Sequence, residues 1–245
     1  MARAILKTGY RCNNRCVFCH SAALRRIPEL GTGALLARLR EAREAGFDGV
    51  VLSGGEPTLR RDLLRVAHRA RELGLGFGLI TNGRVLSYRD RCDALAATGL
   101  EYAYVSIHSA DAVTHDALTG VPGAHAQTLE GIRNLSRHAG VQLTANAVLL
   151  TRTLGGLRDL VSLLGSLPRV RMKLSTVEPR GAMREHPEEV PGVEAAAAAV
   201  RDALEHGLRL GLPRERLAWD GLPFCLMEGW TDRFADLFTD GITAL

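Results

Sequence analysis

Short runs of apolar residues alternate along most of the chain with longer segments in which apolar residues recur at helical spacing. The short runs predict strands at residues 4–10, 49–53, 76–81, 102–107, 142–150 and 169–175, and the longer segments predict helices at residues 33–45, 60–73, 88–97, 125–137, 157–164 and 193–210. A strand followed by a helix and another strand favours parallel pairing with a right-handed crossover. We therefore predict an α/β fold, and periodicity alone leaves open an open barrel or a doubly wound sheet.

The alternation stops after residue 212. Prolines, glycines and two tryptophans interrupt residues 213–245 without a clear period. We predict one main domain at residues 1–212, followed at residues 213–245 by an irregular C-terminal tail or cap over one end of the domain. This tail could also begin a longer auxiliary region.

Charge and hydropathy argue against two kinds of partner. The net charge is only +4, and the arginines are scattered along the predicted helices, so we do not expect binding to nucleic acid. No apolar run reaches the roughly 18 to 20 residues that span a bilayer, and residues 1–7 lack the apolar core of a signal peptide. We expect a cytoplasmic protein with no membrane partner.

Three of the five cysteines, Cys12, Cys16 and Cys19, lie within eight positions directly after the first predicted strand. So short a segment cannot form an ordinary disulfide framework, and in a reducing compartment the clustering predicts a metal site. A C-x3-C-x2-C loop can surround one face of a four-iron cluster and leave the fourth iron without a protein ligand. A structural zinc site that adds His20 or another histidine is the alternative, although His20 is poorly placed beside Cys19 to close the same tetrahedron.

This loop, with Phe18 just before its last cysteine, resembles the signature of the radical S-adenosylmethionine (radical SAM) superfamily. A second hallmark of that family follows at residues 54–57, where the sequence Gly-Gly-Glu-Pro ends the second predicted strand. The resemblance covers roughly residues 4–178. It implies a partial (β/α)6 TIM barrel with a lateral opening, a [4Fe-4S] cluster on Cys12, Cys16 and Cys19, and S-adenosylmethionine bound at the open iron.

The resemblance also implies which residues bind the cofactor. They are Gly54, Gly55 and Glu56 at the methionine end, Phe18 near adenine, and Asn82, Ser106 and Asn146 at the ends of strands three to five. Simpler roles remain open for the last three: a turn pair for Asn82, a helix cap for Ser106 and a hydrogen-bonded core amide for Asn146. His108 faces either substrate or solvent, and no catalytic residue is assigned.

The implied reaction is one-electron cleavage of S-adenosylmethionine to methionine and a 5′-deoxyadenosyl radical, which abstracts hydrogen from a substrate. We expect a peptide or a small natural-product precursor as substrate and a flavodoxin or ferredoxin as electron donor. The sequence leaves open an oxidoreductase, lyase or transferase outcome. The alternatives are a glycyl-radical activase acting on a partner protein and a non-catalytic zinc-binding module.

The two remaining cysteines are isolated. Cys92 is expected to be a buried free thiol in a helix. Cys225 is either a lone buried thiol or the entrance to an auxiliary cluster region. Glu178 and three arginines, at positions 152, 180 and 184, either line the mouth of the barrel or are surface charges.

Overall fold

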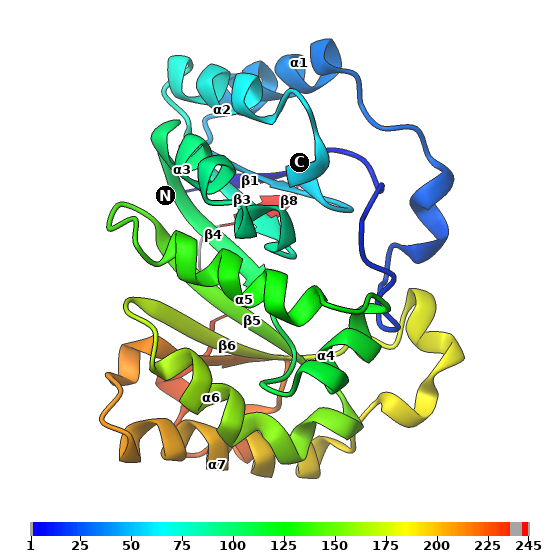
Figure 1. Ribbon diagram of the computed structural model, residues 1–245, viewed down its shortest axis with the longest axis vertical. Helices are drawn as coiled ribbons and strands as arrows, with labels where there is room; N and C mark the ends of the chain where they lie inside the picture. Colours follow the sequence, from blue (N-terminus) through cyan, green and yellow to red (C-terminus); the bar gives the residue numbers. More distant parts are fainter. Residues whose placement is uncertain (1, 236–241, 245) are drawn as a thin grey trace.

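The computed structural model describes residues 2–235 and 242–244 and contains one parallel sheet with helices along its outer face (Figure 1). The strands are β1 Arg3–Lys7, β2 Gly49–Ser53, β3 Gly76–Thr81, β4 Leu100–Ser106, β5 Gln142–Leu149, β6 Val170–Thr176, β7 Leu217–Asp220 and β8 Ile242–Ala244. The α-helices are α1 Thr32–Glu44, α2 Leu63–Glu72, α3 Arg89–Ala97, α4 Ala112–Thr119, α5 Ala124–Leu135, α6 Leu157–Gly165 and α7 Val193–Arg209. The spatial order of the strands is β7-β6-β5-β4-β3-β2-β1-β8.

The predicted α/β fold is confirmed, because strands β1 to β6 each lead into a helix and pair in parallel in sequence order. Helix α4 and strands β7 and β8 were not among the predicted elements. Strand β7 extends the sheet beyond β6, and β8 extends it beyond β1. Within the described residues these two strands end the sheet on opposite sides, so the barrel is partial.

Much of the segment after residue 212 is irregular, with short 3-10 turns on either side of β7. Its residues 236–241 and 245 lie outside the described part of the chain. Because β7 and β8 belong to the sheet, this segment contributes to the barrel as well as covering it. The division of the chain at residue 212 stays a prediction.

Successive side chains of each strand point to opposite faces of the sheet, so each strand contributes to an outer and an inner layer. On β2, Val50 and Leu52 face outward into the main core with the helices, whereas Val51 faces inward. The inward cluster around Val51 is small and contains Tyr102 and Tyr104 of β4. Burying the outward row supplies most of the apolar driving force, at about 1.5–3 kcal/mol for each large side chain. The inner face is thereby free to carry polar residues.

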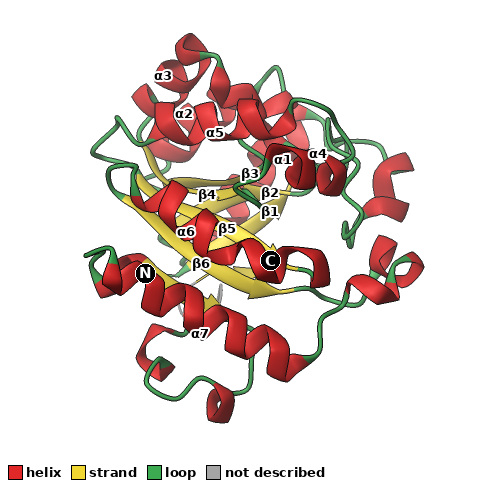
Figure 2. Ribbon diagram, turned by 60° about the horizontal axis from the view of Figure 1, so that its bottom comes forward, coloured by secondary structure: helices red, strands yellow, loops and turns green. Residues whose placement is uncertain are grey.

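Helices α1 to α7 follow the outside of the curved sheet, from α1 and α2 at one end of Figure 1 to α6 and α7 at the other, and Figure 2 shows the curvature of the strands. Since neighbouring strands are parallel, their carboxyl ends meet at one rim, where enzymes of this architecture place their sites. No helix among the described residues is both long and apolar enough to cross a membrane.

Candidate active site

The cysteine loop leaves β1 at the carboxyl rim and is fixed on two sides. The backbone N–H groups of Arg15 and Val17 donate to carbonyl oxygens of Thr119 and Leu118, at 2.7 and 3.0 Å. Those carbonyls lie at the C-terminal end of helix α4. The N-cap of this helix is Asp111, whose carboxylate accepts from the N–H of Thr114 at 2.7 Å. The unpredicted helix α4 is therefore one support of the loop.

The second support comes from the segment after β6. Ala182 donates its N–H to the carbonyl of Cys19 at 3.1 Å. A Cβ on Gly181, whose φ is +62°, would lie 2.5 Å from the Cα of His20 and 2.6 Å from the carbonyl oxygen of Cys19. Only glycine allows this approach, so the two segments are packed backbone to backbone.

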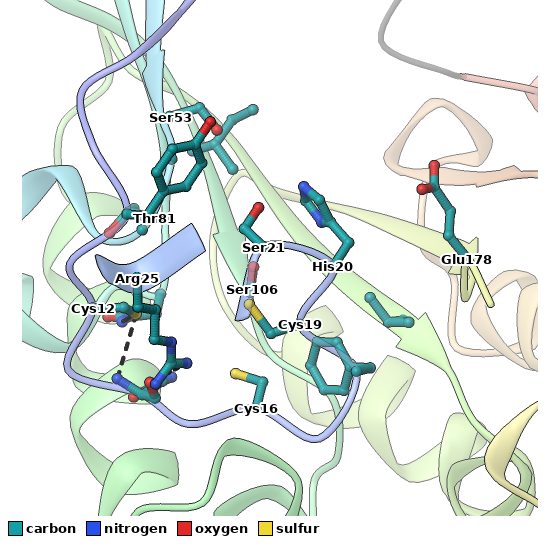
Figure 3. A pocket seen from close by; sticks show the side chains of 18 of the residues that line it. Cys12, Cys16, Cys19, His20, Ser21, Arg25, Ser53, Thr81, Ser106 and Glu178 are labelled. Carbon is teal, nitrogen blue, oxygen red and sulfur yellow. Dashed lines mark hydrogen bonds between the residues drawn. The ribbon is translucent and has the colours of Figure 1, made fainter. Parts of the chain in front are cut away.

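Cys12, Cys16 and Cys19 are all free and half-buried, and all three line one pocket at the carboxyl rim (Figure 3). Burial raises the pKa of Cys12 and raises that of Cys16 to about 12. The backbone N–H of Asn14 lies 3.4 Å from the sulfur of Cys12. Among the described residues, no three His, Cys, Asp or Glu side chains are already drawn together as a metal site. The three thiols share a pocket, and those of Cys12 and Cys16 are protonated at neutral pH.

The glycine-rich turn after β2 packs directly on the cysteine loop. Gly55 and Glu56 donate their N–H groups to the carbonyls of Gly9 and Arg11, both at 2.8 Å. A Cβ on Gly54 would lie 2.2 Å from the Gly9 oxygen, and one on Gly55 would lie 2.1 Å from the Arg11 oxygen. Both glycines are thus required by the contact between the turn and the loop, whatever else they bind.

The Glu56 carboxylate points away from the pocket and is fully buried. It accepts hydrogen bonds from the Thr58 N–H and hydroxyl at 3.0 and 2.6 Å, the Thr81 hydroxyl at 2.7 Å and the Asn82 N–H at 2.7 Å. Desolvation raises its pKa, and these bonds oppose the shift. Glu56 therefore ties the end of β2 to the end of β3.

Asn82 extends this network to the cysteine loop. Its side-chain amide donates to Asn13 Oδ1 at 2.7 Å and lies 3.8 Å from the Cys12 sulfur. Its Oδ1 accepts from the N–H of Arg84 at 3.1 Å. The expected turn at Asn82 and Gly83 is present, and its side chains also position the loop.

Phe18 and His108 meet edge to face in the pocket, with ring centroids 4.6 Å apart. His108 is 2% exposed, so of its two predicted environments the solvent one is wrong. The ring nitrogen Nδ1 of His108 accepts from the backbone N–H of Val148 at 3.2 Å. The backbone N–H of His108 donates to His115 Nδ1 at 3.2 Å. Burial lowers the pKa of His108 to about 3 and that of His115 to about 4. Both rings are neutral at pH 7.

The pocket has a volume of about 280 Å³. Of the residues predicted from the resemblance, those that line it are Cys12, Cys16, Cys19, Phe18, Gly54, Gly55, Asn82 and Ser106. Two predicted residues do not: Glu56 lies behind the turn, and Asn146 faces a neighbouring cavity. Ser106 lines both cavities, so the two spaces adjoin at the end of β4.

The neighbouring cavity, which we call the inner cavity, lies against the concave faces of β3 to β7. Its lining includes Tyr104, Asn146, Lys173, Ser175 and Asp220. Lys173 Nζ and Asp220 Oδ2 form an ion pair at 2.7 Å, with side chains 5% and 20% exposed. Ser175 donates to Asn146 Oδ1 at 2.7 Å. Lys173 and Asp220 were not predicted as site residues. The polar positions 173 and 175, which alternate with Met172 and Leu174, were the available signal.

The predictions for the two isolated cysteines, for Glu178 and for the arginines had different outcomes. Cys92 is buried, as predicted. Cys225 is exposed, so its interpretation as a lone buried thiol is wrong. Glu178 lines both cavities and pairs with the exposed Arg180 at 2.7 Å. Arg152 instead pairs with the buried Glu189. Of Glu178 and the arginines at positions 152, 180 and 184, only Glu178 is among the residues that line the two cavities.

Two named enzymes share about a third of their aligned residues with this chain, over most of its length. A PqqA peptide cyclase from Rhodopseudomonas palustris is 30% identical over 248 residues, covering 97% of this chain and 64% of the relative. An AdoMet-dependent heme synthase from Methanosarcina barkeri is 34% identical over 182 residues, covering 74% and 52%. The chain thus spans about half to two thirds of the lengths of these relatives.

Among solved structures, SuiB from Streptococcus suis bound to its precursor peptide SuiA matches with a TM-score of 0.74 at 16% identity, covering 89% of this chain and 48% of SuiB. At that identity the likeness shows the fold alone. The model of the Radical SAM superfamily matches residues 6–164, which include the cysteine loop, the glycine-rich turn, Asn82, Ser106 and Asn146. This match covers more than half of the sequence, and the chain belongs to the radical SAM superfamily, whose members use S-adenosylmethionine and a [4Fe-4S] cluster.

Proposed function

We propose that this chain holds a [4Fe-4S] cluster on Cys12, Cys16 and Cys19, binds S-adenosylmethionine beside it, and abstracts hydrogen from a peptide substrate. The observation that carries the proposal is the shared pocket, in which three half-buried thiols face the glycine-rich turn at the carboxyl rim of a parallel barrel. When bound, the reduced cluster supplies the electron that cleaves the cofactor's C5′–sulfur bond to give methionine and a 5′-deoxyadenosyl radical.

The donor set suits an iron–sulfur cluster. Three thiols from one short loop can ligate three irons and leave one iron open. Burial keeps the thiols of Cys12 and Cys16 protonated, so binding of iron must release their protons, and affinity for the cluster should rise with pH. The hydrogen bonds of the loop to α4 and to the segment after β6 fix the path of the loop.

The other pocket residues are placed to hold the cofactor. Gly54 and Gly55 present backbone, Asn82 and Ser106 present polar side chains, and Phe18 presents a ring braced by His108. The Glu56 carboxylate already accepts four hydrogen bonds, so a contact of this residue with the cofactor would use its backbone. Its side chain acts by positioning the turn.

The inner cavity is where we place the substrate. It adjoins the cofactor pocket at Ser106 and carries a hydroxyl and an amide, Ser175 and Asn146, beside the Lys173–Asp220 pair. Such groups recognise a polar side chain or a peptide bond. A peptide substrate is supported by the name of the PqqA peptide cyclase and by the SuiB structure with a precursor peptide.

A flavodoxin or ferredoxin would supply the electron. The cysteine loop is only half-buried, and two exposed arginines, Arg11 and Arg15, lie on it. Positive charge beside the loop would favour encounter with an acidic carrier. This partner is a prediction from the chemistry of the reaction.

The test is anaerobic reconstitution with iron and sulfide, followed by dithionite and S-adenosylmethionine. We expect about four irons per chain and release of 5′-deoxyadenosine. Cys16→Ala should lose at least half of the iron and nearly all of the 5′-deoxyadenosine, whereas Cys225→Ser, the change of an exposed thiol, should retain both. A colourless protein with stoichiometric zinc, or Cys16→Ala with full activity, would contradict the proposal and favour the zinc-binding module.

A further inference from the structure

Arg25 lies beside the cysteine loop although it is six residues beyond the last of the three cysteines. The chain turns back after Cys19, where the N–H of Ala22 donates to the Cys19 carbonyl at 3.3 Å, and the 3-10 turn Ala22–Arg26 follows. Arg25 Nη2 donates to the carbonyl oxygen of Asn14 at 2.9 Å. Its side chain lines the cofactor pocket beside Cys12 in Figure 3.

The charge of Arg25 is not neutralised by a carboxylate in the described part of the chain, where the ion pairs do not include it. Its guanidinium is held at Asn14, two residues from both Cys12 and Cys16, and it lines the same pocket as the three cysteines. A cation is therefore fixed beside the loop that carries the proposed cluster ligands.

Arg84 makes a similar contact with the loop but does not line the cofactor pocket. Its Nη1 donates to Asn13 O at 2.6 Å and to Asn14 Oδ1 at 2.8 Å, while its Nε is held by Gln127 Oε1 at 2.7 Å. Both arginines thus hold the stretch at Asn13 and Asn14, and of the two only Arg25 lines the cofactor pocket.

We propose that Arg25 raises the reduction potential of the cluster by placing an uncompensated cation beside Cys12 and Cys16, whereas Arg84 is a positioning residue that only holds the loop. The inference rests on the proposed function, since it assumes that these cysteines bind the cluster. Reduction adds one negative charge to a group already surrounded by thiolates. A fixed cation in a partly buried site stabilises the reduced form more than the oxidised form.

The experiment is a redox titration of the reconstituted cluster, followed by electron paramagnetic resonance without S-adenosylmethionine, together with iron and sulfide analysis. Arg25→Gln should keep its iron and show an about tenfold lower ratio of reduced to oxidised cluster at the wild-type midpoint, a shift of about 59 mV to more negative potential. Arg25→Lys should restore most of the shift. Arg26→Gln, which removes the neighbouring exposed charge, should not move the potential.

Arg84→Gln separates position from charge: it should lower iron retention or the thermal stability of the apoprotein and leave the potential of the remaining cluster unchanged. A wild-type potential in Arg25→Gln would overturn the inference. If Arg25→Gln retains no iron, Arg25→Lys decides, since a wild-type potential supports the role of charge and a full negative shift refutes it. A wild-type chain that binds no four-iron cluster would overturn the proposed function and the inference together, whereas an intact cluster with an unmoved potential overturns the inference alone.

Discussion

The cofactor pocket and the inner cavity adjoin at Ser106, yet they are built from different parts of the chain. The cofactor pocket is shaped by backbone, because the turn at Gly54 and Gly55 packs on the loop that carries the cysteines. The inner cavity is shaped by side chains that project from the concave face of the sheet, among them Lys173 and Asp220. A change in the first region should disturb the scaffold, whereas a change in the second should alter recognition.

Gly54→Ala should give the largest effect. The new Cβ would lie 2.2 Å from the Gly9 oxygen, and the φ of +130° is strained for any other residue. We expect a loss of about 2–6 kcal/mol in unfolding free energy, together with loss of the reconstituted iron. Chemical denaturation and iron analysis measure the two effects.

Gly46→Ala is the matched control, because Gly46 also has a positive φ, +83°, but a Cβ there meets nothing within 4 Å. It should lose only about 1–2 kcal/mol and keep its iron. If the two variants behaved alike, backbone strain alone would explain Gly54, and the packing of the turn on the loop would not matter.

The difference between the cofactor pocket and the inner cavity also explains which residues could be predicted from the sequence. Close approach of backbone requires glycine, and an iron–sulfur cluster requires thiols. The residue type alone therefore indicates the roles of Cys12, Cys16, Cys19, Gly54 and Gly55. The six β/α units were predicted for a similar reason, since an outward apolar row and helical periodicity repeat along the chain. Strand β7 has only four residues, and the buried face of helix α4, at His115, Leu118 and Thr119, contains one apolar side chain, so neither element shows a clear apolar period.

The roles of individual polar residues were harder to predict. Glu56 belongs to the glycine-rich motif, but its side chain turns away from the pocket to hold β3, and only the folded structure reveals the Thr81 and Asn82 donors. Arg25 and Lys173 are single cations among 31 lysines and arginines. What distinguishes them is proximity to segments far away in the sequence, which no local pattern encodes.

Lys173→Met tests the inner cavity and should give the next largest effect. It leaves Asp220 without its partner in a largely buried site, and we expect a loss of about 3 kcal/mol in unfolding free energy, at the low end for a broken buried pair because Asp220 keeps some solvent contact. Cleavage of S-adenosylmethionine in the absence of peptide should continue, since neither residue lines the cofactor pocket.

The exposed pair Arg158–Asp202 provides the comparison. Arg158→Met removes one partner of an ion pair whose side chains are 56% and 43% exposed, so the expected loss of unfolding free energy is much smaller than in Lys173→Met. Equal losses in Lys173→Met and Arg158→Met would show that the inner pair is not held in a low-dielectric site. Loss of peptide-independent cleavage in Lys173→Met would show that the two cavities cannot be separated.

The smallest expected effect concerns His108, which lines the cofactor pocket, and its neighbour His115. The rings of His108 and His115 stack with centroids 5.6 Å apart, and His108 lines the cofactor pocket. Burial first, and then the charge of a neighbouring histidine, lowers the pKa of His115 to about 4 from an ordinary value of 6.5. Between pH 6.5 and 4 the unfolded chain therefore binds a proton at His115 that the folded chain does not, and the unfolding free energy falls as the pH falls.

His115→Gln removes this group and keeps an acceptor for the His108 N–H. The slope of unfolding free energy against pH should decrease by about 1.4 kcal/mol per pH unit between pH 6 and pH 5, measured by urea denaturation of variant and wild type side by side. Carboxylates that titrate in the same range are common to both proteins and cancel in the difference. An unchanged slope would mean that His115 is protonated in the folded state at pH 5, and that water reaches the histidines through one of the two cavities.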